Sequence, residues 1–234
     1  MIRRLEWDSR HFGLEIGRVD GATLSDAAAR EVADQRARFD CVYLLADADH
    51  AETAERAHQL GFCMVDVRVT LVRTLGDAPG GATGDAAIRE ARPADLPRLE
   101  DLAAASYRST RFYFDRRFDR ERADELYRIW IRNEYNNPSV KVHVVDDAAG
   151  VAGYTSCAVR GAESEIGLVA VGEATRGTGK ALVLLEHSLH WAAEHGAGQI
   201  TVVAQARNVA AMRLYERAGF RCRKIGVWYH LWRT

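Results

Sequence analysis

The stretch Ile166-Gly167-Leu168-Val169-Ala170-Val171-Gly172-Glu173-Ala174-Thr175-Arg176-Gly177-Thr178-Gly179-Lys180-Ala181-Leu182 decides the fold of this 234-residue chain. Its first part predicts a strand that ends at Val171. Glycines at 177 and 179 then form a loop that leads directly into an amphipathic helix with leucines at 182, 184 and 185. Such a loop turns successive backbone N–H groups toward one point and adds the positive end of the helix dipole. The stretch therefore predicts an anion site suited to a pyrophosphate.

The spacing of the glycines separates this loop from two other phosphate-binding loops. It is not a Walker loop, because GxxxxGK[ST] is absent, and it is not a GxGxxG dinucleotide loop, because the third glycine is missing. Taken alone, the loop could also be a turn that only joins a strand to a helix.

A second motif follows about thirty residues later, in Asn208-Val209-Ala210-Ala211-Met212-Arg213-Leu214-Tyr215-Glu216-Arg217-Ala218-Gly219-Phe220. The pair of motifs resembles the GNAT superfamily of acetyl-CoA-dependent N-acetyltransferases. The first fits that family's R/Q-x-x-G-x-G/A loop, and the second fits its N-x-x-A-x-x-x-Y-x-x-x-G-F. The resemblance covers roughly residues 85–234.

The resemblance implies an α/β (α+β) fold, with a bent, mixed and mostly antiparallel sheet that is flanked by helices. It also implies acetyl-CoA as the co-substrate, bound where two parallel strands splay apart. The edge of the strand at Val169 and Val171 would pair with the pantetheine arm, which Asn208 would also contact, and Tyr215 would lie beside the sulfur. The pyrophosphate would be cradled by Arg176, Gly177, Thr178, Gly179, Lys180 and Ala181.

The chemistry of acetyl transfer gives Tyr215 a role as general acid. Attack of an amine on a thioester passes through an oxyanion, which a backbone N–H near Val169 would hold, and expels a thiolate that leaves more easily when protonated. We expect Asp66 to be the base that takes the proton of the ammonium group, because it lies four residues after Phe62 on a strand that can face the cleft. A solvent-facing carboxylate with a water chain as the base is the alternative.

Further segments resemble the branch of the superfamily that includes the dTDP-fucosamine acetyltransferases. They are residues 7–13, residues 109–115 and residues 127–130. This likeness implies a nucleotide-linked 4-amino-4,6-dideoxy sugar as acceptor, with Arg111 pairing a phosphate. Aromatic side chains would stack on a base or sugar face, and they are Phe112, Tyr113 and Trp130. The alternative is that Arg111 pairs with Asp115 on a loop and the aromatic rings are core.

An internal repeat predicts that the N-terminal part is a truncated copy of the same fold. Residues 57–63 match residues 215–221 as a helix, a Gly-Phe pair and a strand, and each copy follows a buried strand and a helix. The glycine-rich segment from Gly76 to Gly84 reads as a linker. We therefore expect a truncated GNAT-like domain over residues 1–75, a linker over 76–84 and an acetyltransferase domain over 85–234.

Composition excludes several other classes of protein. The 32 Lys and Arg nearly balance the 33 Asp and Glu, for a net charge of −1, which disfavours a nucleic-acid partner. No run of 18 apolar residues suggests a membrane span, and the N-terminus is no signal peptide. The four cysteines are widely spaced, as expected of buried thiols in a cytoplasmic protein.

Metal binding and oligomerisation have weaker sequence signals. Of His187, His190 and His195 only the first two share a helix face, and they lack a carboxylate partner, so we expect no metal. The last strand, with Trp228, Tyr229 and Trp232, hints at a homodimer surface.

Three other functions stay open on the sequence alone. The acceptor could be another amine, such as an antibiotic or a protein N-terminus. The acyl group could be longer than acetyl. The chain could also be a non-catalytic acyl-CoA sensor, against which the presence of both Asn208 and Tyr215 argues, since binding alone does not require the tyrosine.

Overall fold

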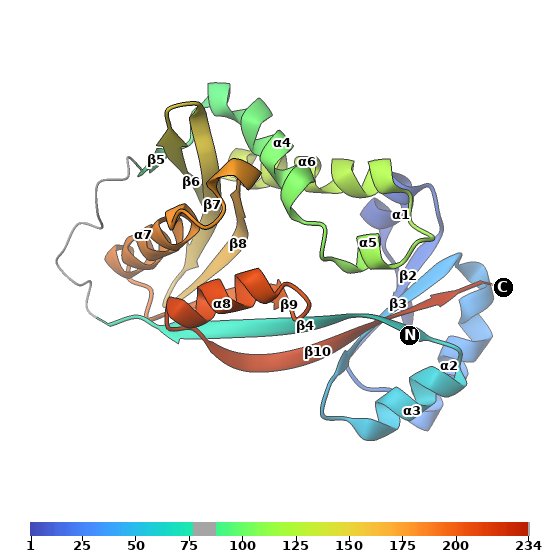
Figure 1. Ribbon diagram of the computed structural model, residues 1–234. Coiled ribbons are helices and arrows are strands. Elements are labelled where there is room, and N and C mark those ends of the chain that lie inside the picture. Colours follow the sequence, from blue (N-terminus) through green and yellow to red (C-terminus); the bar gives the residue numbers. More distant parts are fainter. Residues whose placement is uncertain (77–87, 234) are drawn as a thin grey trace.

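A single mixed sheet organises the protein (Figure 1). The computed structural model describes residues 1–76 and 88–233, and their strands follow the order β1-β2-β3-β10-β4-β9-β8-β7-β6-β5. The strands are β1 (Ile2–Arg4), β2 (Ile16–Val19), β3 (Cys41–Asp47), β4 (Cys63–Thr74), β5 (Ile88–Glu90), β6 (Val140–Asp147), β7 (Gly150–Arg160), β8 (Glu163–Val171), β9 (Gln199–Gln205) and β10 (Arg221–Trp232). Only β2–β3 and β8–β9 pair in parallel. The predicted fold class, with its mostly antiparallel sheet, is confirmed.

The helices divide between the two faces of this sheet. They are α1 (Glu6–Phe12), α2 (Asp26–Gln35), α3 (Ala51–Gln59), α4 (Leu96–Ser106), α5 (Arg111–Phe114), α6 (Arg120–Asn136), α7 (Lys180–Glu194) and α8 (Val209–Arg217). One core joins α1, α4, α5 and α6 to the sheet, and the opposite face packs against α2 and α3 at one end and α7 and α8 at the other. We call the first the upper face and the second the lower face; α1, α4, α5 and α6 lie in the upper half of Figure 1, and α2 and α3 lie at its bottom.

The two parts of the chain interleave their last strands. β4 lies between β9 and β10, and β10 lies between β3 and β4, so each part supplies a strand to the other. The order β2-α2-β3-α3-β4 also repeats as β8-α7-β9-α8-β10, with the parallel pair at the same place in both. The topology therefore has the internal repeat that the sequence predicted. The division into domains at residues 75 and 85 stays a prediction, and most of the expected linker lies outside the described residues.

Local sequence explains where the helices near the site begin. Asp119 accepts a hydrogen bond from the backbone N–H of Arg122 at 2.9 Å and so caps α6. Asn208 accepts one from the backbone N–H of Ala211 at 3.1 Å and caps α8. Both caps satisfy an N–H that has no partner within the first turn of a helix, and they fix the point at which each helix leaves the sheet.

One expectation about side chains is wrong. Cys41 and Cys157 are buried, but Cys63 and Cys222 are exposed, because each lies at the start of a strand that has not yet entered the core.

The homodimer surface expected on the last strand stays a prediction. Trp228 is 9% exposed in the upper core, and Trp232 donates from its indole N–H to Asp115 at 2.7 Å.

None of the helices among the described residues is both long and apolar enough to cross a membrane.

Candidate active site

The site is an opening between two parallel strands. β8 and β9 pair only from Glu163 to Ile166, against Gln199 to Val202, whereas β8 stays paired with β7 as far as Val171. The backbone N–H of Gly172 donates to Ala152 on the β7 side. Because N–H groups alternate sides along a strand, those of Val169 and Val171 point away from β7 into the opening. These are the two predicted edge residues.

A bulge in β8 sets this geometry. The register with β7 shifts between Thr155 and Cys157, and the backbone N–H of Leu168 donates to the hydroxyl of Ser156 at 2.8 Å. That hydroxyl in turn hydrogen-bonds the carboxyl of Glu134 on α6, whose pKa is raised mainly by burial. A Cβ atom at Gly167 would lie 2.8 Å from that carboxyl, so only glycine leaves it room. Sequence reasoning did not single out Glu134 or Ser156, since their link to the bulge is purely tertiary.

The glycine-rich loop closes one end of the opening. Gly177 and Gly179 have φ of 80° and 87°, which favour glycine, and a Cβ atom at either would meet only open space. At the start of α7, the backbone N–H groups of Leu182 and Val183 both donate to the carbonyl of Gly179. The amides just before them are therefore available to an anion at the helix N-terminus.

Two loop residues use their side chains to hydrogen-bond backbone carbonyl groups rather than to line a cavity. The hydroxyl of Thr178 donates to the carbonyl of Thr175 at 2.7 Å, and the ammonium of Lys180 donates to the carbonyl of Asp146 at 3.3 Å. Neither side chain lines the cavity described next, and both hold the loop in shape.

A cavity of about 870 Å³ fills the opening and continues along α8. It brings together eight of the ten residues expected to bind the coenzyme, namely Val169, Val171, Arg176, Gly177, Gly179, Ala181, Asn208 and Tyr215. The end of α4 and the segment after it line the cavity as well, from Ala105 to Ser109. The cavity therefore joins the lower face, with α7 and α8, to the end of α4 from the upper face.

Positive charge gathers around this cavity. Arg108, Arg213 and Arg217 line it together with Arg176, against one lining carboxylate, Glu173. Such a balance suits a ligand with several phosphate charges. Sequence reasoning missed Arg213 and Arg217, although their i, i+4 spacing on α8 was a readable signal.

Tyr215 contributes a buried phenol to the cavity. The residue is 5% exposed, and its ring lies edge-on to Phe220 with 5.7 Å between centroids. Burial raises the pKa of Tyr215 above its usual value of 10, so the hydroxyl keeps its proton at neutral pH.

Asp66 lies on β4 at the upper face and is 2% exposed. Its carboxylate accepts a hydrogen bond from the backbone N–H of Val67 at 2.9 Å and lies 3.4 Å from the guanidinium of Arg207. Burial nevertheless raises the pKa of Asp66, and it outweighs the lowering effect of Arg207. Asp66 does not line the cavity, and it lies on the opposite face of the sheet from Tyr215.

The residues expected to bind the acceptor have separate locations. The guanidinium carbon of Arg111 lies 4.1 Å from the ring centre of Trp228. Phe112 and Tyr113 are 1% and 6% exposed in the upper core, which leaves little ring surface for a ligand. Trp130 is 39% exposed on α6, edge-on to Tyr127.

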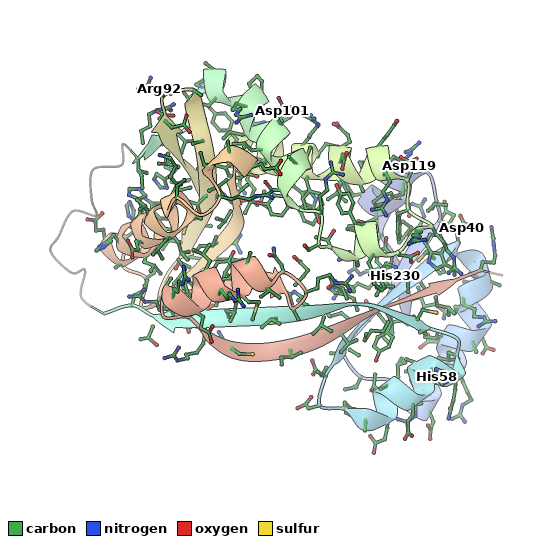
Figure 2. The ribbon with its side chains drawn as sticks, in the orientation of Figure 1. Asp40, His58, Arg92, Asp101, Asp119 and His230 are labelled. Carbon is green, nitrogen blue, oxygen red and sulfur yellow. The ribbon has the colours of Figure 1, made fainter. Side chains whose placement is uncertain are left out.

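The alternative pairing of Arg111 with Asp115 is not formed. Asp115 instead accepts hydrogen bonds from Trp232 and from His230, whose Nδ1 lies 2.8 Å from the carboxylate. Figure 2 shows His230 on β10 beneath α5. Arg111 is thus left on the upper face without that carboxylate.

Comparison with known proteins agrees with this geometry. The family model described as the acetyltransferase (GNAT) family matches residues 96–220. Spore coat polysaccharide biosynthesis protein SpsD of Bacillus subtilis is 30% identical over 140 residues, which cover 60% of this chain and 48% of that protein. The chain thus matches about half the length of SpsD. A dTDP-fucosamine acetyltransferase of Escherichia coli O6:H1 is 25% identical over 232 residues, 98% of this chain and 97% of that one.

A solved structure extends the likeness to both parts of the sheet. A tandem GNAT protein from the clavulanic acid biosynthesis pathway aligns with a TM-score of 0.64 at 12% identity, over 93% of this chain and 75% of that chain. At this identity the likeness concerns the fold alone.

Proposed function

The chain belongs to the acetyltransferase (GNAT) family, and on that premise we propose that it transfers the acetyl group of acetyl-CoA to the primary amine of a dTDP-linked amino-dideoxy sugar. Membership makes it an acyltransferase, and acetyl-CoA is the co-substrate of that family. The proposal adds which residues bind the coenzyme, which move protons and which acceptor is used.

The residues at the opening fit acetyl-CoA. The free edge at Val169 and Val171 offers backbone hydrogen bonds to the amide groups of the pantetheine arm. The loop from Arg176 to Ala181 offers backbone amides and a helix N-terminus to the pyrophosphate. The arginines on α8 add charge for the remaining phosphate. Asn208 uses its side-chain oxygen to cap α8, which leaves its NH₂ group for the arm.

In this mechanism the chain's own groups hold charge and move two protons. The backbone N–H of Val169 donates to the thioester carbonyl oxygen, on which negative charge grows as the amine attacks. Asp66 first takes a proton from the ammonium group, directly or through one water, so that the free amine can attack. The carbon–nitrogen bond then forms, and Tyr215 gives its proton to the sulfur as the carbon–sulfur bond breaks. The second proton, which the nitrogen loses as the amide forms, returns through water to the phenolate of Tyr215.

The pKa values of both groups suit these roles. The raised pKa of Tyr215 keeps the acid protonated until the sulfur becomes charged. The raised pKa of Asp66 makes it a better proton acceptor than a solvent-exposed aspartate.

Support for the acceptor comes from the relatives and from the upper face. One relative is named as a dTDP-fucosamine acetyltransferase and aligns with nearly the whole of this chain, and the other takes part in polysaccharide synthesis. Arg111 lies beside Asp66 on the upper face, from which an amine would approach. The charge of Arg111 and its backbone N–H both lower the pKa of the Asp66 carboxyl.

The observation that carries the proposal is the cavity, which places the free β8 edge, the glycine-rich loop and Tyr215 in one space. The test is thiol release from acetyl-CoA with dTDP-4-amino-4,6-dideoxygalactose, its glucose epimer, an aminoglycoside and a peptide with a free N-terminus. We expect rapid release with one of the two nucleotide sugars. Release only with the aminoglycoside or the peptide would replace the acceptor, and binding of acetyl-CoA without release by any amine would favour a sensor.

A further inference from the structure

Three arginines meet on the upper face from three different elements. Arg18 on β2 pairs in register with Tyr43 on β3, and Arg68 follows Asp66 by two residues on β4. Paired residues share a face, and so do residues two apart on one strand, so both side chains project to the upper face. The third, Arg111, comes from the first turn of α5 above them.

The ring of Trp228 contacts two of these arginines, Arg18 and Arg111. Trp228 pairs with Asp66 on one side and with Leu45 on the other, and its ring lies on the upper face. The guanidinium carbon of Arg111 lies 4.1 Å from the ring centre, and that of Arg18 lies 5.1 Å from it. The aromatic ring positions both guanidinium groups without neutralising either of them.

None of the three arginines forms a close ion pair. Among residues 1–76 and 88–233, no acidic oxygen lies within 4.0 Å of a guanidinium nitrogen of any of the three. Acids that act on them from a greater distance are Asp8 on α1, Asp20 after β2, Asp66, and Glu165 on β8, and the ion pair of Asp66 is with Arg207. The Nε atom of Arg111 is buried and has no hydrogen-bond partner.

Burial and mutual repulsion both disfavour the charged forms of these arginines. The pKa values of Arg18 and Arg68 are both lowered, first by burial and also by the charge of Arg111. Three like charges at a half-buried place cost folding free energy unless an anion joins them. The arrangement is therefore unfavourable for the empty protein and favourable for a complex with a multiply charged anion.

We infer that Arg18, Arg68 and Arg111 form a diphosphate-binding site on the upper face, separate from the pyrophosphate site of the glycine-rich loop. Guanidinium groups from three directions match the several oxygens of a diphosphate, to which arginine binds in a bidentate manner. The inference rests on the proposed function and deepens it, since the ligand would be the diphosphate of the nucleotide sugar. Asp66 lies two residues before Arg68 on β4, so a sugar attached to this diphosphate lies on the same face of the sheet as the proposed base.

Binding of dTDP and of inorganic pyrophosphate, measured by titration calorimetry without acetyl-CoA, tests the site. We expect dTDP to bind the wild-type protein, and Arg18→Gln and Arg68→Gln each to weaken it roughly tenfold or more, as the loss of a charge-assisted contact does. Arg30→Gln on exposed α2 is the matched control and should leave dTDP binding unchanged. Binding of 3′,5′-ADP, a fragment of coenzyme A, should be the same in all four proteins.

Thermal unfolding separates a binding role from a structural one. Removal of one of three repelling charges should leave the Tm of ligand-free Arg18→Gln and Arg68→Gln equal to or above that of wild type. Saturating dTDP should raise the Tm of wild type by more than that of either variant. A lower Tm in the ligand-free variants, with unchanged dTDP affinity, would overturn the inference.

Two further outcomes keep this inference distinct from the proposed function. If dTDP competes with coenzyme A and binds Arg18→Gln as tightly as wild type, the nucleotide occupies the coenzyme loop and the inferred site is wrong. If dTDP binding depends on the cluster but neither amino sugar releases thiol, the site stands and the acceptor of the proposed function falls.

Discussion

At the scale of single residues, Tyr215 has the clearest chemical assignment. Its phenol is buried against the opening, and burial raises its pKa, so replacing it removes a proton donor and little else. We expect Tyr215→Phe to lower kcat roughly a hundredfold while the KM for acetyl-CoA changes little. Steady-state thiol release measures both constants.

Tyr229→Phe provides the control for this variant. Tyr229 is a half-buried tyrosine on β10 that packs against the lower core near β3, away from the cavity. Loss of the Tyr229 hydroxyl should not change kcat. Wild-type turnover in Tyr215→Phe across the pH range would remove Tyr215 as the acid.

Asp66 is expected to act as a base over a limited range of pH. Its pKa is raised by burial, so as the pH falls through that value the carboxyl gains a proton and the wild-type rate falls. Asp66→Asn should be slow mainly at pH values above the pKa of Asp66 and below that of the amine, because at higher pH the free amine forms without help. The pH profile of kcat measures this, with Asp34→Asn at an exposed position of α2 as the control. A variant as fast as wild type within that range would assign the proton to water.

His143 is expected to make stability depend on pH. It is 6% exposed beside His187, with 4.4 Å between ring centres, and burial lowers its pKa to about 4. A histidine that stays neutral in the folded state binds more protons when unfolded, so stability is complete above about pH 6.5 and falls as the pH drops toward 4. The difference corresponds to about 3 kcal/mol at most.

Replacement of the histidine tests this dependence. His143→Phe should flatten the fall in Tm between pH 7 and pH 5, whereas His58→Asn on the exposed face of α3 (Figure 2) should not change it. An unchanged slope in His143→Phe would place the acid sensitivity in other groups, such as His230, whose pKa burial also lowers to about 4.

At the scale of elements, the bulge of β8 connects α6 to the backbone N–H of Val169, the proposed oxyanion site. The carboxyl of Glu134 on α6 is hydrogen-bonded to the hydroxyl of Ser156, and this hydroxyl accepts a hydrogen bond from the backbone N–H of Leu168. The N–H of the next residue, Val169, is left free for the substrate. Glu134 and Ser156 therefore position the strand and do not need to touch the substrate.

Gly167→Ala should disturb this link, because the added Cβ atom would lie 2.8 Å from the carboxyl of Glu134 and 2.9 Å from the hydroxyl of Ser156. We expect kcat to fall roughly tenfold with little change in the KM for acetyl-CoA, as one displaced hydrogen bond to a strand would cause. Gly198→Ala is the control, since its Cβ atom would meet only a carbonyl oxygen at 3.8 Å. Combination with Glu134→Ala should restore part of the rate, and a double variant as slow as the single one would contradict this explanation.

At the scale of the whole molecule, the interleaving of β4 and β10 ties the two parts together. Both neighbours of β4, which are β9 and β10, come from the C-terminal part, and both neighbours of β10, which are β3 and β4, come from the N-terminal part. Removal of residues 1–75 would separate β9 from β10 and expose both edges along their length.

We therefore expect residues 1–75 and residues 85–234, each expressed alone, to lack a cooperative thermal transition. Co-expression of the two fragments should restore the transition and thiol release, because β4 can still enter between β9 and β10. Calorimetry and the thiol assay measure these outcomes. A cooperative transition and acetyl-CoA binding in residues 85–234 alone would instead show an independent domain.

The sequence determined those features that depend on neighbours along the chain. The glycine-rich loop needs φ values that glycine supplies at 177 and 179, and the motif around Tyr215 is one capped helix followed by a strand, so both are readable from spacing. The sequence also predicted the strand that ends at Val171, which is the last residue of β8. Pattern reasoning missed short elements such as β1, α1 and α5, since three to seven residues give too few repeats of a period.

Only the tertiary structure decided which distant residues meet. The splay of β8 from β9, the contact of Glu134 with the bulge and the gathering of Arg18, Arg68 and Arg111 around Trp228 each join segments dozens of residues apart. Sequence spacing fixes neither the order of strands in a sheet nor the charges that face each other across it. The exchange of β4 and β10 joins the two repeats into a single sheet. The glycine-rich loop and the arginine cluster are therefore carried by the same sheet.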